Sequence, residues 1–172
     1  MRISAKRMQA KNHSSKLRLP NGRSLEIGSA PEHLPCIMGI VNITKDSFFE
    51  GSRRLEPKAA IETALDMIRQ GASIIDFGAE STRPGSKEID PKEELSRILP
   101  VLEGFRAVSD AVISVDTRHP KVAEAALAAG ADIINDIEAL QRPGMAEVVA
   151  RGRAAAILMH MQGIPRTMQL NP

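Results

Sequence analysis

Aromatic residues are scarce in this chain of 172 residues, which has four phenylalanines and neither tryptophan nor tyrosine. Proteins that bind single-stranded nucleic acids stack the bases on aromatic rings, and nucleic-acid-binding domains carry strongly basic surfaces. The net charge of this chain is only +2. We therefore expect it to have no nucleic-acid partner.

Cysteine and long apolar runs are equally scarce. The single cysteine, Cys36, cannot form an internal disulfide, which is typical of proteins from a reducing compartment. No apolar run approaches the roughly 20 residues that a membrane helix needs. The basic residues 1–7 are not followed by the apolar core of a secretory signal. We expect a cytoplasmic protein that does not contact a membrane.

The N-terminal part of the chain differs from the rest. Residues 1–15 are polar and basic without periodicity, and we expect them to be disordered. Residues 16–19 and 23–28 alternate between apolar and polar side chains on either side of an Asn-Gly pair, which predicts a β-hairpin at about 16–28. We assign residues 16–172, hairpin included, to a single domain, since the length and the 42% hydrophobic content suit one core.

From residue 35 onward the chain repeats the order strand, loop, helix. Two junctions are near copies, GASIID at 71–76 and GADIIN at 130–135, and each places a helix-ending glycine directly before a buried strand. This is the βα repeat of a parallel sheet. Pro100 lies inside one helical stripe, where we expect it to kink or split the helix. The predicted strands are 36–41, 73–77, 111–115, 132–134 and 154–159, and the predicted helices are 57–70, 120–129, 144–150 and one that begins after Asp90.

A parallel α/β sheet is either a closed barrel or an open, doubly wound sheet. The glycine-rich dinucleotide fingerprint of the open form is missing. Polar residues instead follow every predicted strand, which favours a (β/α)8 TIM barrel with its chemistry in the βα loops. Such a barrel takes roughly 250 residues. We therefore expect an incomplete TIM barrel with strands 1 to 5, either a fragment or a chain completed by a partner. The polar strand ends are 42–51, 80–86, 114–118, 135–136 and 160–163.

Five segments follow one another along the chain and combine a short apolar run with polar residues. They are 38–48 (MGIVNITKDSF), 76–85 (DFGAESTRPG), 113–117 (ISVDT), 133–136 (IIND) and 158–163 (LMHMQG). In this order they resemble the signature motifs of dihydropteroate synthases. The resemblance implies a transferase of folate biosynthesis that condenses 6-hydroxymethyl-7,8-dihydropterin pyrophosphate with para-aminobenzoate, giving 7,8-dihydropteroate and pyrophosphate. It also implies that the enzyme is a sulfonamide target and that the full-length protein is a homodimer.

The resemblance also implies roles for particular residues. Asp116 and Asn135 belong to the pterin pocket, where a carboxylate suits the N–H donors of the pterin and an amide can both donate and accept. Asn42 lies near a Mg²⁺ ion bound to the pyrophosphate. Asp116, Asn135 and Arg83 form the expected catalytic set. The other expected substrate contacts are Thr82 and Arg83 from a mobile loop, Phe48 and Pro84 around the aminobenzoate ring, and Ile137 and Met159 in the pterin pocket.

Other interpretations stay open at this stage. Asp116 is alternatively a cap for the helix that begins at Pro120, and Asn135 a turn residue. Asp76 we interpret as structural, hydrogen-bonded to a neighbouring loop. The chain as a whole is alternatively a pterin-binding methyltransferase domain or a non-catalytic pterin-binding remnant.

The chain also departs from the family. Lys45 stands where members usually carry proline, and its effect is open. The later family motifs, among them the anion site of strand 8, have no counterpart, so we expect this chain alone to be inactive or nearly so.

Overall fold

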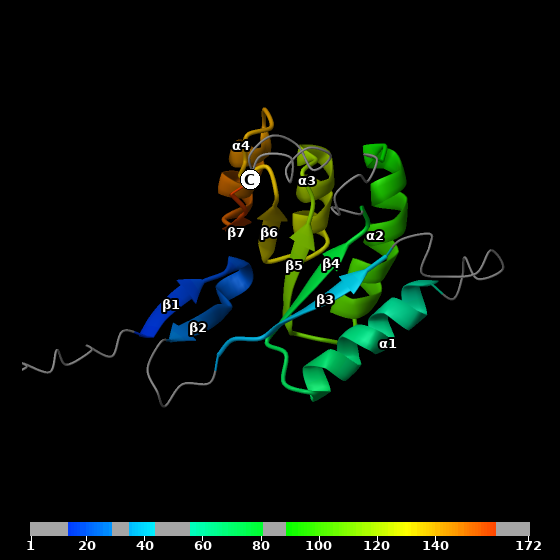
Figure 1. Ribbon diagram of the computed structural model, residues 1–172, viewed down its shortest axis with the longest axis vertical. Helices are drawn as coiled ribbons and strands as arrows, with labels where there is room; N and C mark the ends of the chain where they lie inside the picture. The colour runs from blue at the N-terminus through cyan, green and yellow to red at the C-terminus, as the bar shows by residue number, and fades with distance from the viewer. Residues whose placement is uncertain (1–13, 29–34, 44–55, 81–88, 161–172) are drawn as a thin grey trace, which may run out of the picture.

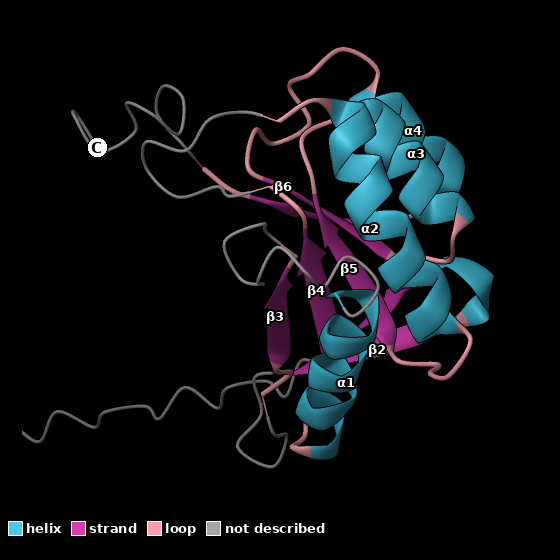
Figure 2. Ribbon diagram, turned by 90° about the vertical axis from the view of Figure 1, so that its right-hand side faces the viewer, coloured by secondary structure: helices cyan, strands magenta, loops and turns pink. Residues whose placement is uncertain are grey.

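The computed structural model describes residues 14–28, 35–43, 56–80 and 89–160. Five strands form one parallel sheet whose spatial order equals their order in the chain. The described α-helices all cover one face of this sheet (Figures 1 and 2). The strands are β3 (Met38–Asn42), β4 (Ile74–Gly78), β5 (Val112–Asp116), β6 (Ile133–Asp136) and β7 (Ala155–Leu158), and the helices are α1 (Glu56–Arg69), α2 (Pro91–Arg106), α3 (Pro120–Ala128) and α4 (Met145–Gly152).

This winding distinguishes a barrel from a doubly wound sheet. In the doubly wound fold the strand order reverses and helices cover both faces, whereas a barrel adds each strand on the same side of the last one. The order β3-β4-β5-β6-β7, with helices on one face, is the barrel pattern. The fold is therefore an incomplete TIM barrel, as expected, and the elements lie within two residues of their predicted bounds.

The predicted N-terminal hairpin is present. Strands β1 (Ser14–Arg18) and β2 (Ser24–Gly28) pair antiparallel and are joined by the 3-10 turn η1 (Pro20–Gly22). Leu19 N–H donates to the Arg23 carbonyl at 2.9 Å, which closes a three-residue loop. Its last residue, Gly22, has a φ of 77°, which is the left-handed conformation that such loops require. The turn therefore contains the Asn-Gly pair that indicated the hairpin, preceded by Pro20.

The sheet is packed on both faces. Between sheet and helices lies the main core, where Phe77 of β4 meets Phe105 of α2 edge to face with ring centroids 5.3 Å apart. The other face carries a smaller cluster in which the hairpin residues Leu19 and Leu25 pack with Ile74 and other side chains at the beginnings of the strands. The hairpin therefore covers the inner face at the amino-terminal ends of the strands and leaves the carboxyl-terminal ends to the site.

Helix α2 runs unbroken through Pro100. Of the two outcomes that we expected at Pro100, the split is wrong, because the residues on either side of this exposed proline remain helical. The kink stays a prediction. Asp90 caps this helix by accepting the N–H of Lys92 at 2.8 Å. Among the described residues, no helix combines the length and the apolar character needed to cross a membrane.

Candidate active site

Polar side chains gather on the inner face of three adjacent strands. Successive side chains of a strand alternate between its faces, so Asp76 and Gly78 of β4 share one face. The register places Asp76 beside Ser114, and Asp116 between Gly78 and Asn135. These residues lie on the face opposite the helices, at the carboxyl-terminal half of the strands. This is where a TIM barrel carries its active site.

The side chains in this group contact one another. Asn135 Nδ2 donates to Asp76 Oδ2 at 3.3 Å, although β5 lies between their strands. A Cβ atom added to Gly78 would lie 3.7 Å from Asp116 Oδ2 and 3.8 Å from Asn42 Oδ1, so Asn42 and Asp116 border the same gap. The structure thus brings together the predicted residues Asn42, Asp116 and Asn135. It adds Asp76, which we expected to bond to a loop and which instead bonds to a side chain of the same face.

The electrostatics of the group favour neutral carboxyls. Burial, together with the nearby carboxylates of Asp76, Glu94, Glu80 and Asp136, raises the pKa of Asp116 to about 7. Burial also raises the pKa of Asp76, although hydrogen bonds from Ser114 and Asn135 act in the opposite direction. Because perturbed carboxyls in a cavity are typical of functional sites, the pKa shifts support the assignment that the sequence suggested.

The alternative roles for two of these residues are wrong. Helix α3 begins after His119, which is its cap, so Asp116 is not the capping residue. Asn135 is part of strand β6 and pairs across the sheet, so it is not a turn residue. Asp136, the next residue, has the turn role: its carboxylate accepts the N–H groups of Glu138 and Leu140, each at 2.8 Å.

The remaining predicted residues are tested less directly. Ile137 is buried just beyond β6 and Met159 is half-buried just beyond β7, but no contact with the Asp76–Asn135 pair is described for either, so their pocket role stays a prediction. The predicted loop residues Phe48, Thr82, Arg83 and Pro84 lie outside the described part of the chain.

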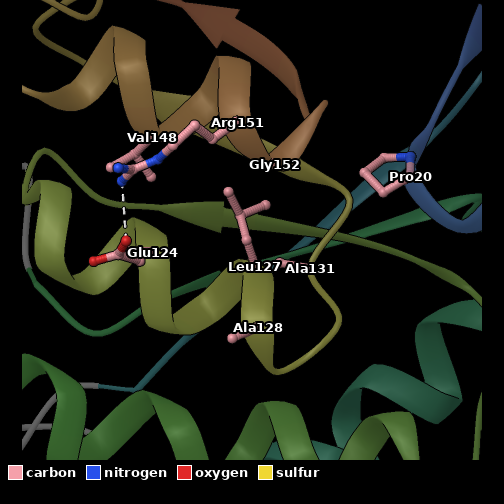
Figure 3. A pocket seen from close by; sticks show the side chains of 8 residues that line it. All are labelled: Pro20, Glu124, Leu127, Ala128, Ala131, Val148, Arg151 and Gly152. Atoms are coloured by element: carbon pink, nitrogen blue, oxygen red, sulfur yellow. Dashed lines mark hydrogen bonds and ion pairs between the residues drawn. The ribbon is translucent and has the colours of Figure 1, made fainter.

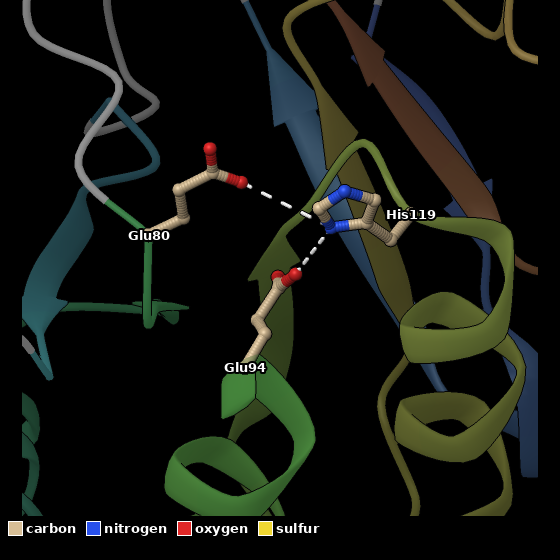
Figure 4. Close-up of side chains that lie close together, drawn as sticks. All are labelled: Glu80, Glu94 and His119. Atoms are coloured by element: carbon tan, nitrogen blue, oxygen red, sulfur yellow. Dashed lines mark hydrogen bonds and ion pairs between the residues drawn. The ribbon is translucent and has the colours of Figure 1, made fainter. Parts of the chain in front are cut away.

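A second group of charged side chains was not found by reading the sequence. Arg118, just beyond β5, forms a buried ion pair with Glu80 and a partly buried one with Glu138. Beside it, His119 Nδ1 lies 2.6 Å from Glu94 Oε2 and 3.9 Å from Glu80 Oε2 (Figure 4). Only the adjacency of basic Arg118-His119 to the Asp-Thr motif could have indicated it, because the acidic partners are far away in sequence.

The donor atoms of Glu80, Glu94 and His119 lie within 4.8 Å of one another, a set that could hold a metal ion. Both carboxylates already have partners, however: Arg118 pairs with Glu80, and His119 contacts Glu94. A cation here would be repelled by the Arg118 guanidinium. We therefore interpret the group as an ion-pair network.

One surface pocket lies far from these carboxylates (Figure 3). It is lined by Pro20 of the hairpin turn, by Leu127 at the end of α3 and by Arg151 of α4, among others. Helices of a βα unit run antiparallel to their strands, so the end of α3 marks the amino-terminal ends of the strands. The only charged pair that Figure 3 draws there, Glu124 and Arg151 at 3.0 Å, is mostly exposed. We assign no chemistry to this pocket.

Comparisons with known proteins agree with the geometry. Residues 38–172 match the family model described as pterin binding enzyme. The dihydropteroate synthase of Escherichia coli (strain K12) is 46% identical over 138 residues, which cover 80% of this chain and 49% of the relative. The mitochondrial folate synthesis bifunctional protein of Arabidopsis thaliana is 44% identical over 155 residues, covering 88% of this chain and 27% of the relative.

Solved structures give the same result. Xanthomonas albilineans dihydropteroate synthase with 4-aminobenzoic acid superposes with a TM-score of 0.79 at 42% identity, covering 88% of this chain and 53% of that one. Burkholderia cenocepacia dihydropteroate synthase, complexed with 7,8-dihydropteroate, gives a TM-score of 0.72 at 37% identity over 91% and 50% of the two chains. This chain spans about half the length of the bacterial relatives it matches.

Proposed function

The chain belongs to the pterin-binding enzyme family, and from that premise we propose that it supplies the pterin-binding side of a dihydropteroate synthase. The proposed reaction joins 6-hydroxymethyl-7,8-dihydropterin pyrophosphate to para-aminobenzoate and releases pyrophosphate. We further propose that the protein acts in the cytoplasm and that its full-length form is a homodimer. The name shared by the bacterial relatives favours this function over a methyltransferase domain or a non-catalytic remnant.

The observation that carries the proposal is the convergence of Asp76, Asp116 and Asn135 on one face at the strand ends. A pterin presents N–H donors beside ring acceptors along one edge. Carboxylates accept such donors, and the Asn135 amide can pair with either kind of group. Burial and the acidic neighbours raise the pKa of the Asp116 carboxyl to about 7. When the pterin binds, this carboxyl gains an N–H partner, which favours its charged form.

In the proposed reaction the side chains of the protein take little part in making or breaking covalent bonds. The amine nitrogen of para-aminobenzoate attacks the methylene carbon of the pterin, the carbon–oxygen bond to pyrophosphate breaks, and the oxygen leaves with the electron pair. The attacking amine then releases a proton. Asp116 and Asn135 hold the pterin so that its methylene carbon faces the amine, which is a contribution of orientation.

The loop residues outside the described part of the chain complete the proposal. We assign Arg83 to an anionic group of the substrates, because its guanidinium can bind phosphate or carboxylate in a forked arrangement. Thr82 would add a hydroxyl donor. Phe48 and Pro84 would enclose the aminobenzoate ring and exclude water from a carbon that hydrolyses easily once pyrophosphate departs.

We also propose Mg²⁺ as the cofactor, with Asn42 as its protein contact. Magnesium prefers oxygen ligands and keeps several of its waters. Asn42 Oδ1 fits this preference, because it is exposed at the end of β3 and borders the same gap as the Asp116 carboxylate. A bound Mg²⁺ would supply positive charge against the pyrophosphate.

Calorimetric titration with pteroic acid, which contains both the pterin and the aminobenzoate, tests the proposal. We expect saturable binding to this chain and its loss in Asp116→Ala. The matched control is Asp66→Ala, which removes an exposed carboxylate of α1 and should bind like the unchanged chain. Pteroic acid that produces no saturable heat, or equal binding by Asp116→Ala, would contradict the proposal.

Turnover is a separate test of the same chain. We expect the 172-residue chain alone to convert the two substrates at a rate close to zero. A turnover number equal to that of a full-length relative would contradict this expectation.

A further inference from the structure

Arg118 contacts carboxylates from both neighbouring strand ends. Its Nε lies 3.4 Å from Glu80 Oε2, and its terminal nitrogen pairs with the other oxygen of the same carboxylate. The remaining terminal nitrogen donates to Glu138 Oε1 at 3.2 Å. The side chains of Arg118 and Glu80 are 10% and 4% exposed, so the Glu80 ion pair is largely shielded from water.

The positions of these residues in the chain show that the contacts link three strand ends. Glu80 lies two residues beyond the end of β4, Arg118 two beyond the end of β5, and Glu138 two beyond the end of β6. One guanidinium therefore joins three consecutive strand ends. Those strands carry, in the same order, the site residues Asp76, Asp116 and Asn135.

Stability alone does not account for this arrangement. Buried ion pairs contribute little net stability compared with apolar side chains of similar size, because both charges lose their hydration. A guanidinium differs from other groups in its rigid, planar fork, which can hold two carboxylates at defined directions at once. Directional contacts of this kind specify relative position.

Neighbouring contacts make the network rigid. Arg142 Nε donates to Glu138 at 2.7 Å and so fixes the carboxylate that Arg118 reaches. His119, the next residue, contacts Glu94 of α2 at 2.6 Å, which anchors the connection after β5 to the helix behind it (Figure 4). Arg118 is therefore fixed by the anchored backbone next to it and by the two carboxylates that it contacts.

We propose that Arg118 is a positioning residue that sets the spacing of Asp76, Asp116 and Asn135 by joining the ends of β4, β5 and β6. It does not contact the ligand in this proposal. Its importance for ligand affinity rests on the proposed pterin function, whereas its effect on the spacing of the three side chains does not.

The test compares variants that remove the contacts of Arg118 with one that removes a distant ion pair. The double variant Arg118→Met with Glu80→Gln removes both charges, so it leaves no unpaired buried carboxylate at Glu80. Arg118→Lys keeps the charge but loses the fork. The control is Arg151→Met, which removes an exposed ion pair with Glu124 at the opposite end of the strands.

The first readout needs no ligand. The side-chain amide of Asn135, which donates to Asp76, gives its own nuclear magnetic resonance signals. We expect these signals to shift in the double variant and in Arg118→Lys, and to stay in place in Arg151→Met. Unchanged Asn135 signals in a folded double variant would overturn the proposal whatever the ligand proves to be.

The second readout is the dissociation constant for pteroic acid. We expect it to rise at least about tenfold in the double variant, which is the lower end of the loss seen when supporting groups of a site are removed. A smaller rise is expected for Arg118→Lys and none for Arg151→Met. Shifted Asn135 signals with unchanged affinity would overturn the link to binding, whereas an unchanged chain that never binds pteroic acid would count against the proposed function alone.

Discussion

Asn135 and Asp76 meet through a 3.3 Å hydrogen bond although a whole strand lies between them. Neighbouring strands are about 4.8 Å apart, so side chains of next-but-one strands on a flat sheet stand roughly 10 Å apart at their bases. The hydrogen bond requires the two side chains to approach one another across β5 on the face opposite the helices, which the inward curvature of a barrel sheet allows. Barrel curvature therefore assembles this site.

The raised pKa of Asp116 predicts how stability depends on pH. Its pKa moves from the ordinary 3.8 to about 7 on folding. The folded chain thus retains a proton between about pH 4 and 7 that the unfolded chain has released. The contribution of Asp116 to the free energy of unfolding is greatest below pH 4 and is lost as the pH rises to about 7. Asp116→Asn should therefore be more stable than the unchanged chain at pH 8, by about 0.5–2 kcal/mol.

Urea denaturation at pH 4, 6 and 8 checks this expectation. The two curves should nearly coincide at pH 4 and separate as the pH increases. Glu124→Gln, which neutralises an exposed carboxylate, should show no such separation. A constant difference between Asp116→Asn and the unchanged chain at every pH would show that the carboxyl does not titrate in this range.

We expect the change from glycine to alanine to affect stability differently at two strand positions, Gly78 and Gly39. A Cβ at Gly78 would meet Asp116 and Asn42 at 3.5–3.8 Å, which is ordinary contact distance. Gly78→Ala should therefore fold with an unfolding free energy within about 1 kcal/mol of the unchanged chain. Its methyl group should nevertheless weaken pteroic acid binding, since it occupies the gap between two site residues.

Gly39→Ala is the contrasting variant. Its Cβ would lie 2.6 Å from Met67 Sδ, which can move, but also 3.2 Å from Met67 Cβ and 3.3 Å from Ile75 Cδ1 on the helix-covered face. Overpacking should therefore cost about 1–3 kcal/mol. Urea denaturation gives the stability of both variants, and calorimetry gives the affinity of Gly78→Ala. Pteroic acid affinity that is unaltered in Gly78→Ala would place the ligand elsewhere.

Sequence reasoning located the strands and helices because they depend on local patterns, whereas the candidate site residues came from the resemblance to dihydropteroate synthases. The repeated glycine–strand junctions at 71–76 and 130–135 predicted parallel strands, and polar residues after each strand predicted one shared rim. The hairpin was predicted correctly for the same reason, since alternating runs on either side of an Asn-Gly pair are a local signal.

The ion-pair network around Arg118 is a feature that local sequence patterns could not predict. Glu80 and Arg118 are 38 residues apart, and the sequence around either residue does not indicate its partner. Asp76 was misinterpreted for a related reason: its partner, Asn135, is 59 residues away and two strands over. Pairings of this kind follow from curvature and register, which only the assembled sheet defines.

Pro100 provides a stability prediction within α2. An exposed proline inside a helix lacks the N–H that would bond to the preceding turn, and its ring crowds that turn. Pro100→Ala restores the donor but gives the unfolded chain more freedom. We expect a net gain of about 1 kcal/mol in the free energy of unfolding. Lys92→Ala, a change at an exposed position of the same helix that carries no such defect, should stay within about 0.5 kcal/mol of the unchanged chain in the same urea measurement.

Among the variants discussed, we expect Asp132→Ala to lose the most unfolding free energy. Its fully buried carboxylate pairs with Arg23 of the hairpin at 2.7 Å and with Arg106 of α2 at 3.0 Å. It also accepts the backbone N–H of Ile113 at 3.1 Å. Removing this carboxylate takes away the acceptor of Arg23 and of the Ile113 N–H, and leaves the Arg106 guanidinium hydrogen-bonded to backbone carbonyls only, without its carboxylate partner. Asp132→Ala should therefore lose about 3–5 kcal/mol of unfolding free energy.

Asp66→Ala, which breaks the exposed pair with Arg69, is the control and should lose less than about 1 kcal/mol. Hydrogen exchange adds a local measurement. Because Arg23 joins the hairpin to Asp132, the amides of β1 and β2 should lose protection in Asp132→Ala by a larger factor than those of β4. Equal losses in the hairpin and in β4 would show that Asp132 stabilises the whole domain rather than fastening the hairpin to it.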